Sequence, residues 1–386
     1  MGALRLAVIG AFPFPLSQGS QLYVRDQLGA LQQLGTEITL FCYGTGEGNA
    51  PEELDIVRVP RGLSPSVLRT GPALGKPLAD AALSGALLAA HRRRPFDVAL
   101  AHNGEAALAA LLARSAGGLP VVYVAHTLIE HELPTFCPPL LGPVARAAGR
   151  TLDSTIAGRV DAIIALCRDA GKALEPRARG PVTVIAPGLD PAASPERARV
   201  DQVCRRFGLV RGRFALYTGN VDGYQGLDLL AEAAQLAPDI AWVVATHGKH
   251  RFEAAGVSCV RTTPEEARAL GFGCGAALLP RRCPGGYPIK LLNYMEAARP
   301  IVAFEGIADG LEHDRSAWLL PPEAGPTAFA EAVRTLQGEP ERADRIGAAA
   351  RSHLESHHGW HDLAVRTLRF CGDASRKAGN GVRLLR

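Results

Sequence analysis

Residues 214–230 read Phe-Ala-Leu-Tyr-Thr-Gly-Asn-Val-Asp-Gly-Tyr-Gln-Gly-Leu-Asp-Leu-Leu, and this stretch decides the fold. An apolar run is followed by three glycines (Gly219, Gly223 and Gly226) and then by a helical apolar pattern from Leu227. A buried strand, a turn and a helix in this order begin a βαβ unit. Such a turn can present backbone N–H groups to a phosphate, although a tight turn alone also explains the glycines. The stretch matches neither the Walker A loop nor the G-x-G-x-x-G pattern.

The same alternation of short apolar runs and helical patterns continues in both directions and predicts an α/β protein with parallel sheets. The predicted strands of the first half are residues 4–10, 37–43, 56–59, 97–102, 120–125, 162–165 and 182–185. Those of the second half are residues 214–220, 241–245, 257–261, 275–280, 301–304 and 317–320, with helices over 227–236 and 289–298. A linker with a surface helix is predicted near 187–213, and a helix over 360–370 is followed by a loose tail, 372–386.

Composition narrows the class of protein. The chain has 386 residues, 47% of them hydrophobic and 21% charged, and this length and balance predict two globular domains. A net charge of +4 is too small to indicate nucleic acid as a partner. No apolar run approaches about 20 residues, so no membrane-spanning helix is predicted, and the apolar start of the chain is interpreted as a strand, not as a signal peptide. The eight cysteines form no C-x-x-C pair, which favours free thiols in a cytoplasmic protein over a zinc site or a disulfide framework.

Lysine is scarce, because only five of the 42 basic Lys and Arg residues are lysines. One of them, Lys290, follows Gly285 and Gly286 and falls in the first turn of a predicted helix. A cation there opposes the helix dipole unless an anion binds, although a surface lysine that snorkels explains the same pattern. Asn293 lies one turn further along and either binds a sugar hydroxyl or only decorates the helix. The pair Arg281-Arg282 is interpreted as a solvated face.

Two histidines follow predicted strands. His126 comes directly after the run 120–125, and His102 ends the run 97–102. Ligands of open α/β sheets bind at the carboxyl ends of the strands, which makes both candidates for a binding site, although histidines at strand ends also serve as structural hydrogen-bond partners. The H-E-x-x-H spacing of a metal-binding helix is absent, so no metal site is predicted.

Taken together, these segments resemble the family 4 glycosyltransferases, retaining enzymes of the GT-B fold that use nucleotide-sugar donors. The resemblance covers almost the whole chain and rests on residues 16–31, 34–40, 182–190, 216–230, 285–302, 317–322 and 360–370. It implies two Rossmann-like, doubly wound parallel-sheet domains that face a cleft. The first, residues 1–188 completed by the helix 360–386, would hold the acceptor, and the second, residues 189–359, the donor.

The resemblance also implies roles for individual residues. His126 and Lys290 match positions close to the reacting sugar and diphosphate and are the predicted catalytic residues. The predicted donor-binding residues are Gly19, Gly219, Asn220, Gln225, Gly285, Gly286, Tyr287, Ile289 and Asn293. No metal and no further cofactor is implied, because the nucleotide sugar is a co-substrate.

The chain departs from the family pattern in both loops of the second half. Asn220 and Gln225 stand where members commonly carry an Arg and a Lys, and Gly285 and Asn293 stand where they commonly carry two Glu. Two interpretations follow. Either Lys290 supplies the missing positive charge, assisted by backbone amides near Gly219, Gly223, Gly285 and Gly286, or the chain binds without catalysing.

The function expected from the resemblance is hexosyl transfer with retention from a nucleotide sugar, with UDP-sugars favoured. The expected acceptor is a glycan, lipid or small molecule, most simply a cell-envelope glycan or lipid-linked saccharide. Peripheral contact with the inner face of the membrane through a basic surface of the first half fits such acceptors. The alternatives are a non-catalytic GT-B binding protein and another GT-B enzyme, a nucleotide-sugar epimerase or a phosphorylase, of which the latter is disfavoured because no pyridoxal-type lysine context is present.

Overall fold

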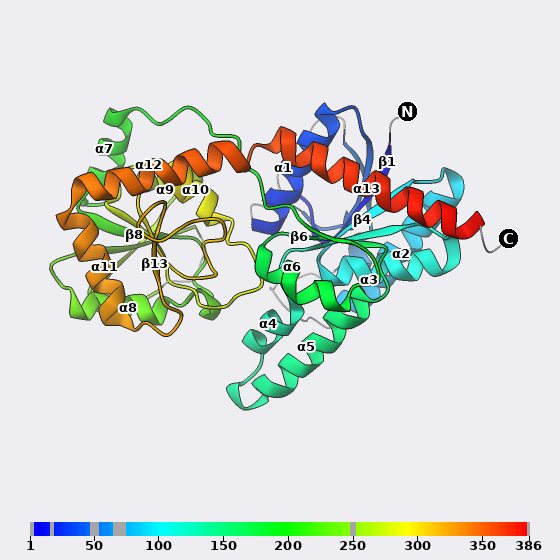
Figure 1. Cartoon of the computed structure of the whole chain (residues 1–386), viewed down its shortest axis with the longest axis horizontal. Coiled ribbons are helices and arrows are strands. Elements are labelled where there is room, and N and C mark those ends of the chain that lie inside the picture. Colours follow the sequence, from blue (N-terminus) through cyan, green and yellow to red (C-terminus); the bar gives the residue numbers. More distant parts are fainter. Residues whose placement is uncertain (1–3, 16–18, 47–53, 65–74, 248–251, 384–386) are drawn as a thin grey trace. The chain divides into compact units, whose positions relative to one another are not determined.

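The computed structural model describes residues 4–15, 19–46, 54–64, 75–247 and 252–383 (Figure 1). Contacts within the chain gather into two compact units. Unit 1 comprises Met1–Gly188, Gly285–Tyr287 and Trp360–Arg386, and unit 2 comprises Leu189–Pro284 and Pro288–Gly359. The short segment Gly285–Tyr287, predicted to belong to the second half, therefore groups with unit 1.

Unit 1 is built on a sheet of seven parallel strands in the order β3-β2-β1-β4-β5-β6-β7. The strands are β1 (Arg5–Pro13), β2 (Glu37–Tyr43), β3 (Asp55–Arg58), β4 (Val98–His102), β5 (Val121–Ala125), β6 (Ala162–Ala165) and β7 (Val182–Val184). Every side chain of β5 is fully buried, as expected for a central parallel strand that helices cover on both faces. The order reverses at β1, so the carboxyl ends of β1 and β4 flank the switch point where ligands of such sheets bind.

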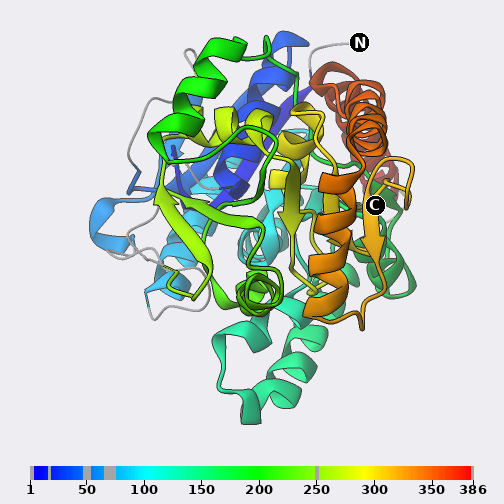
Figure 2. The ribbon, with the colours of Figure 1, turned by 90° about the vertical axis from the view of Figure 1, so that its left-hand side faces the viewer.

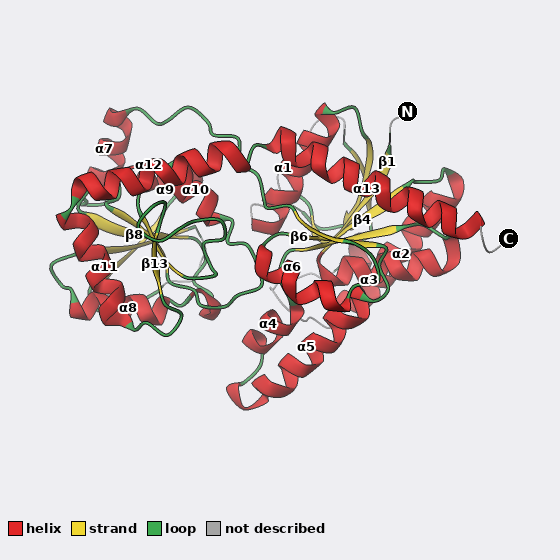
Figure 3. Cartoon of the chain, in the orientation of Figure 1, coloured by secondary structure: helices red, strands yellow, loops and turns green. Residues whose placement is uncertain are grey.

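Helices flank this sheet (Figure 3). They are α1 (Gly19–Gln33), α2 (Lys76–Arg93), α3 (Asn103–Gly117), α4 (Ile129–Glu132), α5 (Gly142–Ala157), α6 (Arg168–Leu174) and α13 (Trp360–Arg383), with 3-10 turns η1 (Arg61–Leu63), η2 (Leu133–Phe136), η3 (Pro139–Leu141) and η4 (Glu175–Arg177). Helix α2 packs against α3, and α1 packs against α13, although α1 and α13 lie at opposite ends of the sequence. Gly118 ends α3 in the left-handed conformation, with a φ of 75°.

The prediction of a loose tail after residue 372 is wrong, because α13 continues to Arg383. Its buried face consists of Leu363, Ala364, Thr367, Cys371 and Ala374, each at most 3% exposed and spaced by one, three or four residues. This spacing is helical, but small side chains carry it beyond residue 370. The apolar pattern is therefore weak in the sequence although the helix remains packed.

Unit 2 repeats the design with six parallel strands in the order β10-β9-β8-β11-β12-β13. The strands are β8 (Phe214–Thr218), β9 (Ala241–Thr246), β10 (Val257–Arg261), β11 (Ala276–Leu279), β12 (Ile301–Phe304) and β13 (Trp318–Leu320). The helices are α7 (Arg197–Arg206), α8 (Leu227–Leu236), α9 (Pro264–Gly273), α10 (Lys290–Glu296), α11 (Pro326–Gly338) and α12 (Pro340–His357), with the 3-10 turn η5 (Gly223–Gln225). The two parallel sheets confirm the predicted fold class.

Local chemistry fixes the ends of several of these elements. Thr263 and Glu266 form a capping box at the start of α9, in which the Thr263 hydroxyl accepts from the Glu266 amide at 3.2 Å and the Glu266 carboxylate accepts from the Thr263 amide at 2.9 Å. Gly226 precedes α8 with a φ of 74°, and a Cβ there would lie 2.5 Å from the carbonyl oxygen of Pro280. Only glycine fits this turn, which brings the β8 loop close to the end of β11.

Within the described ranges no helix is long and apolar enough to cross a membrane. The eight cysteines all lie in the described ranges, where none of them forms a disulfide, and five of them are buried.

Candidate active site

Two histidines meet at the carboxyl edge of the unit 1 sheet. His102 ends β4 and His126 follows β5, and these strands are neighbours in register, with His102 opposite Val124. His102 Nδ1 lies 3.0 Å from His126 Nε2, and the two side chains are 0% and 7% exposed. The structure thus joins two residues that the sequence had placed only at separate strand ends.

Both imidazoles are neutral at physiological pH. Burial lowers the pKa of His126 to about 3, and burial together with the nearby His126 lowers the pKa of His102 well below its usual range. His102 Nε2 is buried without a hydrogen-bond partner among the described residues. A lone pair is tolerated there better than an unpaired N–H, so the His102 proton belongs on Nδ1 and is donated to His126 Nε2. His126 then carries its own proton on Nδ1.

Aromatic rings enclose this histidine pair. The Tyr23 ring of α1 lies 5.0 Å from the His126 ring and 5.9 Å from the His102 ring, both edge to face. The ring of Trp360, the first residue of α13, lies 5.6 Å from Tyr23. The Tyr23 hydroxyl accepts a hydrogen bond from Gln27 Nε2 at 2.8 Å. The two histidines therefore have largely apolar surroundings, which favour the neutral form of both imidazoles.

Lys290 and Tyr217 form the centre of a second cluster, in unit 2. Lys290 Nζ donates to the Tyr217 hydroxyl at 2.6 Å and to Gln225 Oε1 at 2.9 Å, and it lies 3.9 Å from the centre of the Tyr217 ring. Burial is the main reason that the pKa of Lys290 lies well below its usual value; nearby Arg281 lowers it further, whereas Asp222 raises it. Burial also raises the pKa of Tyr217. The ammonium thus contacts two neutral acceptors.

Asn220 and Gln225 support this lysine. Gln225 Nε2 donates to Asn220 Oδ1 at 2.7 Å, and Asn220 Nδ2 donates to Asp222 at 2.6 Å. The Tyr217 hydroxyl donates in turn to the backbone carbonyl of Asn220 at 2.6 Å. The two positions that the resemblance assigns to cations are therefore occupied by amides, of which Gln225 contacts the Lys290 ammonium and Asn220 supports Gln225. The lysine reaches the first loop from α10.

Gly219 directly follows β8, lies beside Lys290 and has a structural role of its own. Its amide donates to the carbonyl of Ala245 at 3.0 Å, which continues the pairing of β8 with β9. This N–H is therefore engaged within unit 2, and whether Gly219 contacts the donor stays a prediction. Gly219 is needed for space, because its φ is 132° and a Cβ would lie 2.9 Å from Lys290 Nζ.

Gly285 and Gly286 pair with the backbone that follows β5 in unit 1. The Gly285 carbonyl accepts from the Leu128 amide at 2.9 Å, and Gly286 forms an antiparallel bridge with Thr127, the residue after His126. A Cβ on Gly286 would lie 2.6 Å from Thr127 Cγ2. These glycines therefore allow two backbones to approach beside the histidine pair. Tyr287, 6% exposed, groups with unit 1 as well.

The remaining predicted residues lie outside both clusters. Gly19 is the exposed first residue of α1, and Ile289 is half-buried before α10. Asn293 lies on α10 with its side chain exposed. No contact described for the chain brings these side chains to Lys290 or to His126.

Arg281 lies near Lys290 and is buried, whereas the sequence predicts a solvated face for Arg281 and Arg282. It is only 7% exposed and donates to the carbonyl of Cys283 at 2.8 Å. Tyr217 and Tyr294 were not singled out at all. The Tyr294 hydroxyl accepts from the Thr218 amide at 2.8 Å and ties α10 to the end of β8. The place of Tyr217 near the end of a predicted strand is the sequence feature that could have identified it as a candidate site residue.

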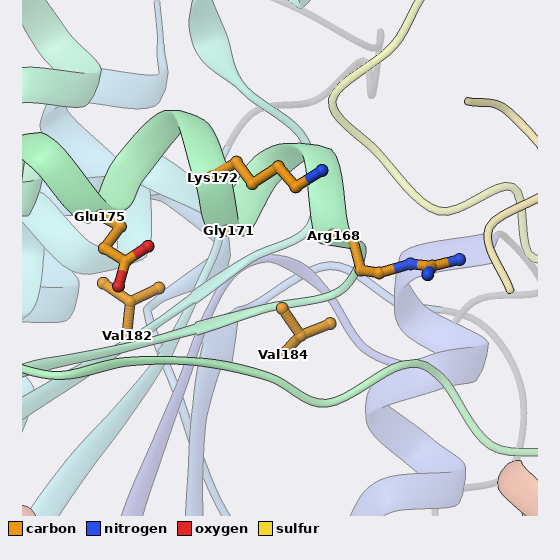
Figure 4. A pocket seen from close by; sticks show the side chains of 6 residues that line it. All are labelled: Arg168, Gly171, Lys172, Glu175, Val182 and Val184. Atoms are coloured by element: carbon orange, nitrogen blue, oxygen red, sulfur yellow. The ribbon is translucent and has the colours of Figure 1, made fainter.

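A separate groove lies between α6 and β7 in unit 1, with a volume of about 240 Å³ (Figure 4). Its lining residues are Arg168, Gly171, Lys172, Glu175, Val182 and Val184. In Figure 4 the Arg168 and Lys172 side chains extend toward the same end of the groove and Glu175 lies at the other end.

Over the part of the chain that the structure describes, no group of three His, Cys, Asp or Glu side chains could hold a metal ion.

Comparisons with known proteins agree with this architecture. The family described as Glycosyltransferase Family 4 matches residues 17–193, and the family described as Glycosyl transferases group 1 matches residues 212–338. A relative from Rhodococcus erythropolis, D-inositol 3-phosphate glycosyltransferase, is 26% identical over 98% of this chain and 93% of its own length. The protein of the same name from Kineococcus radiotolerans is 25% identical over 94% of each chain.

Solved structures show the same fold. Sucrose-phosphate synthase from Thermosynechococcus elongatus superposes with a TM-score of 0.78 at 14% identity, covering 95% of this chain and 98% of that one. Anabaena Alr3699/HepE in complex with UDP-glucose superposes with a TM-score of 0.70 at 14% identity, covering 95% and 99%. With both halves matched by glycosyltransferase families on two parallel-sheet domains, the chain belongs to the family 4-like glycosyltransferases of the GT-B fold.

Proposed function

We propose that this glycosyltransferase uses a UDP-sugar and binds its diphosphate at the Lys290 cluster of unit 2. The observation that carries the proposal is the half-buried ammonium of Lys290, whose hydrogen bonds to described residues go to the neutral acceptors Tyr217 and Gln225. A partly desolvated cation with no carboxylate partner among the described residues is costly unless a ligand brings negative charge. Arg281 adds a second cation nearby. A UDP donor is supported by the solved structure of Anabaena Alr3699/HepE, which was determined in complex with UDP-glucose.

The reaction needs stabilisation of the leaving diphosphate more than it needs a nucleophile. As the bond from the anomeric carbon to the phosphate oxygen breaks, negative charge grows on UDP, and Lys290 and Arg281 would stabilise it. The acceptor oxygen forms its bond on the same face, its proton passes to the departing phosphate, and the configuration is retained. These two cations would perform the role that a metal ion has elsewhere, so activity should survive a chelator.

His126 would position the sugar. With its proton on Nδ1 it can donate a hydrogen bond to a sugar hydroxyl. The sugar gains positive, oxocarbenium-like charge in the transition state. A neutral imidazole in contact with it avoids the repulsion that an imidazolium would cause. The low pKa of His126, about 3, is therefore suited to this role.

The acceptor we propose is a hydroxyl of a saccharide, either a cell-envelope glycan or a lipid-linked saccharide. The D-inositol 3-phosphate glycosyltransferases among the relatives add a polyol phosphate to the candidates. Eight cysteines without a disulfide favour a reducing compartment, and this supports the cytoplasm as the proposed site of the reaction.

The experiment is donor binding and turnover by three proteins: wild type, Lys290→Met and the control Lys172→Met, whose lysine is exposed on α6. Loss of one charge-assisted contact should weaken UDP binding about 10–100-fold in Lys290→Met and leave the control unchanged. Equal affinities would contradict the diphosphate site. Transfer to saccharide acceptors should accompany binding in the wild type. Donor conversion without any acceptor would identify an epimerase instead, and binding without turnover a non-catalytic protein.

A further inference from the structure

Unit 1 carries a helical projection whose end is apolar. Helix α4, the turns η2 and η3, and helix α5 extend together away from the sheet, as both views show (Figures 1 and 2). We define residues 133–144 as the tip. The side chains of Phe136, Leu140, Leu141 and Val144 are 37%, 90%, 50% and 68% exposed. Four large apolar side chains thus meet water within nine residues, which marks an interaction surface.

The backbone of the tip is suited to a medium without water. Four of its twelve residues, Pro134, Pro138, Pro139 and Pro143, are prolines and lack an N–H donor. The amide of Leu141 donates to the Pro138 carbonyl at 2.9 Å, and the Cys137 amide donates to the Pro134 carbonyl at 3.2 Å. The Thr135 hydroxyl donates to the Glu132 carbonyl at 2.7 Å. These polar groups can therefore leave water without losing their hydrogen bonds, which is the main requirement for entering lipid.

Charge indicates which partner the tip meets. Residues 133–152 contain no Asp or Glu, and their two charged residues are Arg146 and Arg150. Both arginines lie on exposed positions of α5, one turn apart, directly behind the tip. An apolar end with cations behind it complements a bilayer that carries negative headgroups, because the side chains enter the acyl region while the guanidinium groups remain at the phosphates.

We propose that the tip inserts into an anionic membrane surface and anchors unit 1 there. The anchor consists of Leu140, Leu141 and Val144 in the interface and Arg146 and Arg150 at the headgroups. The surface differs from the basic face predicted from the sequence, because apolar insertion is its main element. It would bring the protein to the membrane where lipid-linked acceptors lie, but binding itself needs no substrate.

The experiment is cosedimentation with vesicles of phosphatidylglycerol and phosphatidylcholine in equal parts, and with vesicles of phosphatidylcholine alone, in the absence of any donor. Wild type should bind the anionic vesicles. The double variant Leu140→Ser, Val144→Ser should bind these vesicles at least about tenfold more weakly than the wild type. The matched control is Leu112→Ser with Val210→Ser, which replaces side chains that are 62% and 68% exposed elsewhere. The control should bind as wild type does.

The variants Arg146→Gln and Arg150→Gln should each weaken binding to anionic vesicles about fivefold and leave the weaker binding to neutral vesicles unchanged. Absence of wild-type binding would overturn the proposal, as would equal losses in the tip and control variants. If the tip substitutions instead convert a dimer to a monomer in light scattering, a second copy covers the tip and the membrane proposal is wrong. Donor binding, measured separately, is unaffected by either result, so failure of the anchor and failure of the proposed function remain distinguishable.

Discussion

In unit 1 two histidines meet with no charge between them, whereas in unit 2 a lysine and an arginine lie near each other beside one aspartate. Both clusters follow the ends of parallel strands, so the difference comes from their surroundings. The rings of Tyr23 and Trp360 favour neutral imidazoles. The amides and hydroxyl around Lys290 provide dipoles that orient an ammonium without neutralising it. The histidine cluster is thus stable without charge, whereas the lysine cluster would be stabilised by the anion that we propose it binds.

The largest expected effect concerns the neutral pair in acid. Because the folded pKa of His126 is about 3, below the usual value of 6.5, the unfolded chain binds a proton that the folded chain excludes. The stability from this group is fully present above pH 6.5 and is lost as pH falls toward 3, with up to tenfold in the folding equilibrium per pH unit. Denaturant titrations between pH 3 and pH 6.5 should show that the free energy of unfolding decreases as the pH falls.

Two variants test the assignment of that slope. His126→Gln removes the imidazole and should flatten the dependence, while His361→Gln, which removes an exposed imidazole at the start of α13, should not. An unchanged slope in His126→Gln would mean that other groups set the acid limit.

The second effect concerns the cation cluster in alkali. The lowered pKa of Lys290 means that the free protein loses this charge below pH 10.5, and a bound diphosphate stabilises the protonated form. Donor affinity should therefore fall by up to tenfold per pH unit above the pKa of the free protein. Titration calorimetry with UDP at increasing pH measures this loss of affinity.

The control for this titration is Lys290→Arg. Its guanidinium keeps its charge throughout the range, so the pH dependence of UDP affinity should disappear even if the affinity itself changes. A dependence that persists in Lys290→Arg would assign the titration to another group and weaken the contrast between the clusters.

The smallest effect separates the two histidines. His102 acts as a positioning residue if it fixes the tautomer of His126 through Nδ1. His102→Leu should lower kcat/KM about fivefold, whereas His102→Asn, whose amide can donate from nearly the same place, should retain most of it. Nitrogen NMR should show the His126 proton on Nδ1 in wild type and a mixture of the two neutral tautomers in His102→Leu. Identical spectra and rates in all three proteins would reduce His102 to a packing residue.

The fold was largely predictable because parallel strands that are buried on both faces are continuous apolar runs, such as residues 121–125. The end of α13 was missed because alanine, threonine and cysteine form its buried face. The same limit explains Arg281, which looks like any surface arginine until its burial is known.

The clusters were predictable only in part. His126 and Lys290 could be chosen from their places after a strand and at a helix start. Their partners could not, because strand register brings His102 to His126 across 24 residues, and the packing of α10 brings Tyr217 to Lys290 across 73. The pairing of the Gly219 amide with Ala245 was also hidden, because the sequence does not show which amides are already paired in the sheet.

The packing of α13 on α1 has a consequence for synthesis on the ribosome. The sheet of unit 1 is complete by Val184, yet the helix that covers Tyr23 begins at Trp360. At about 5–20 residues per second, translation of the intervening chain takes roughly 10–35 seconds. During this interval the part of α1 that packs against α13 lacks this cover, although α1 can already pack against the sheet. The last helix to be synthesised thus completes the first domain.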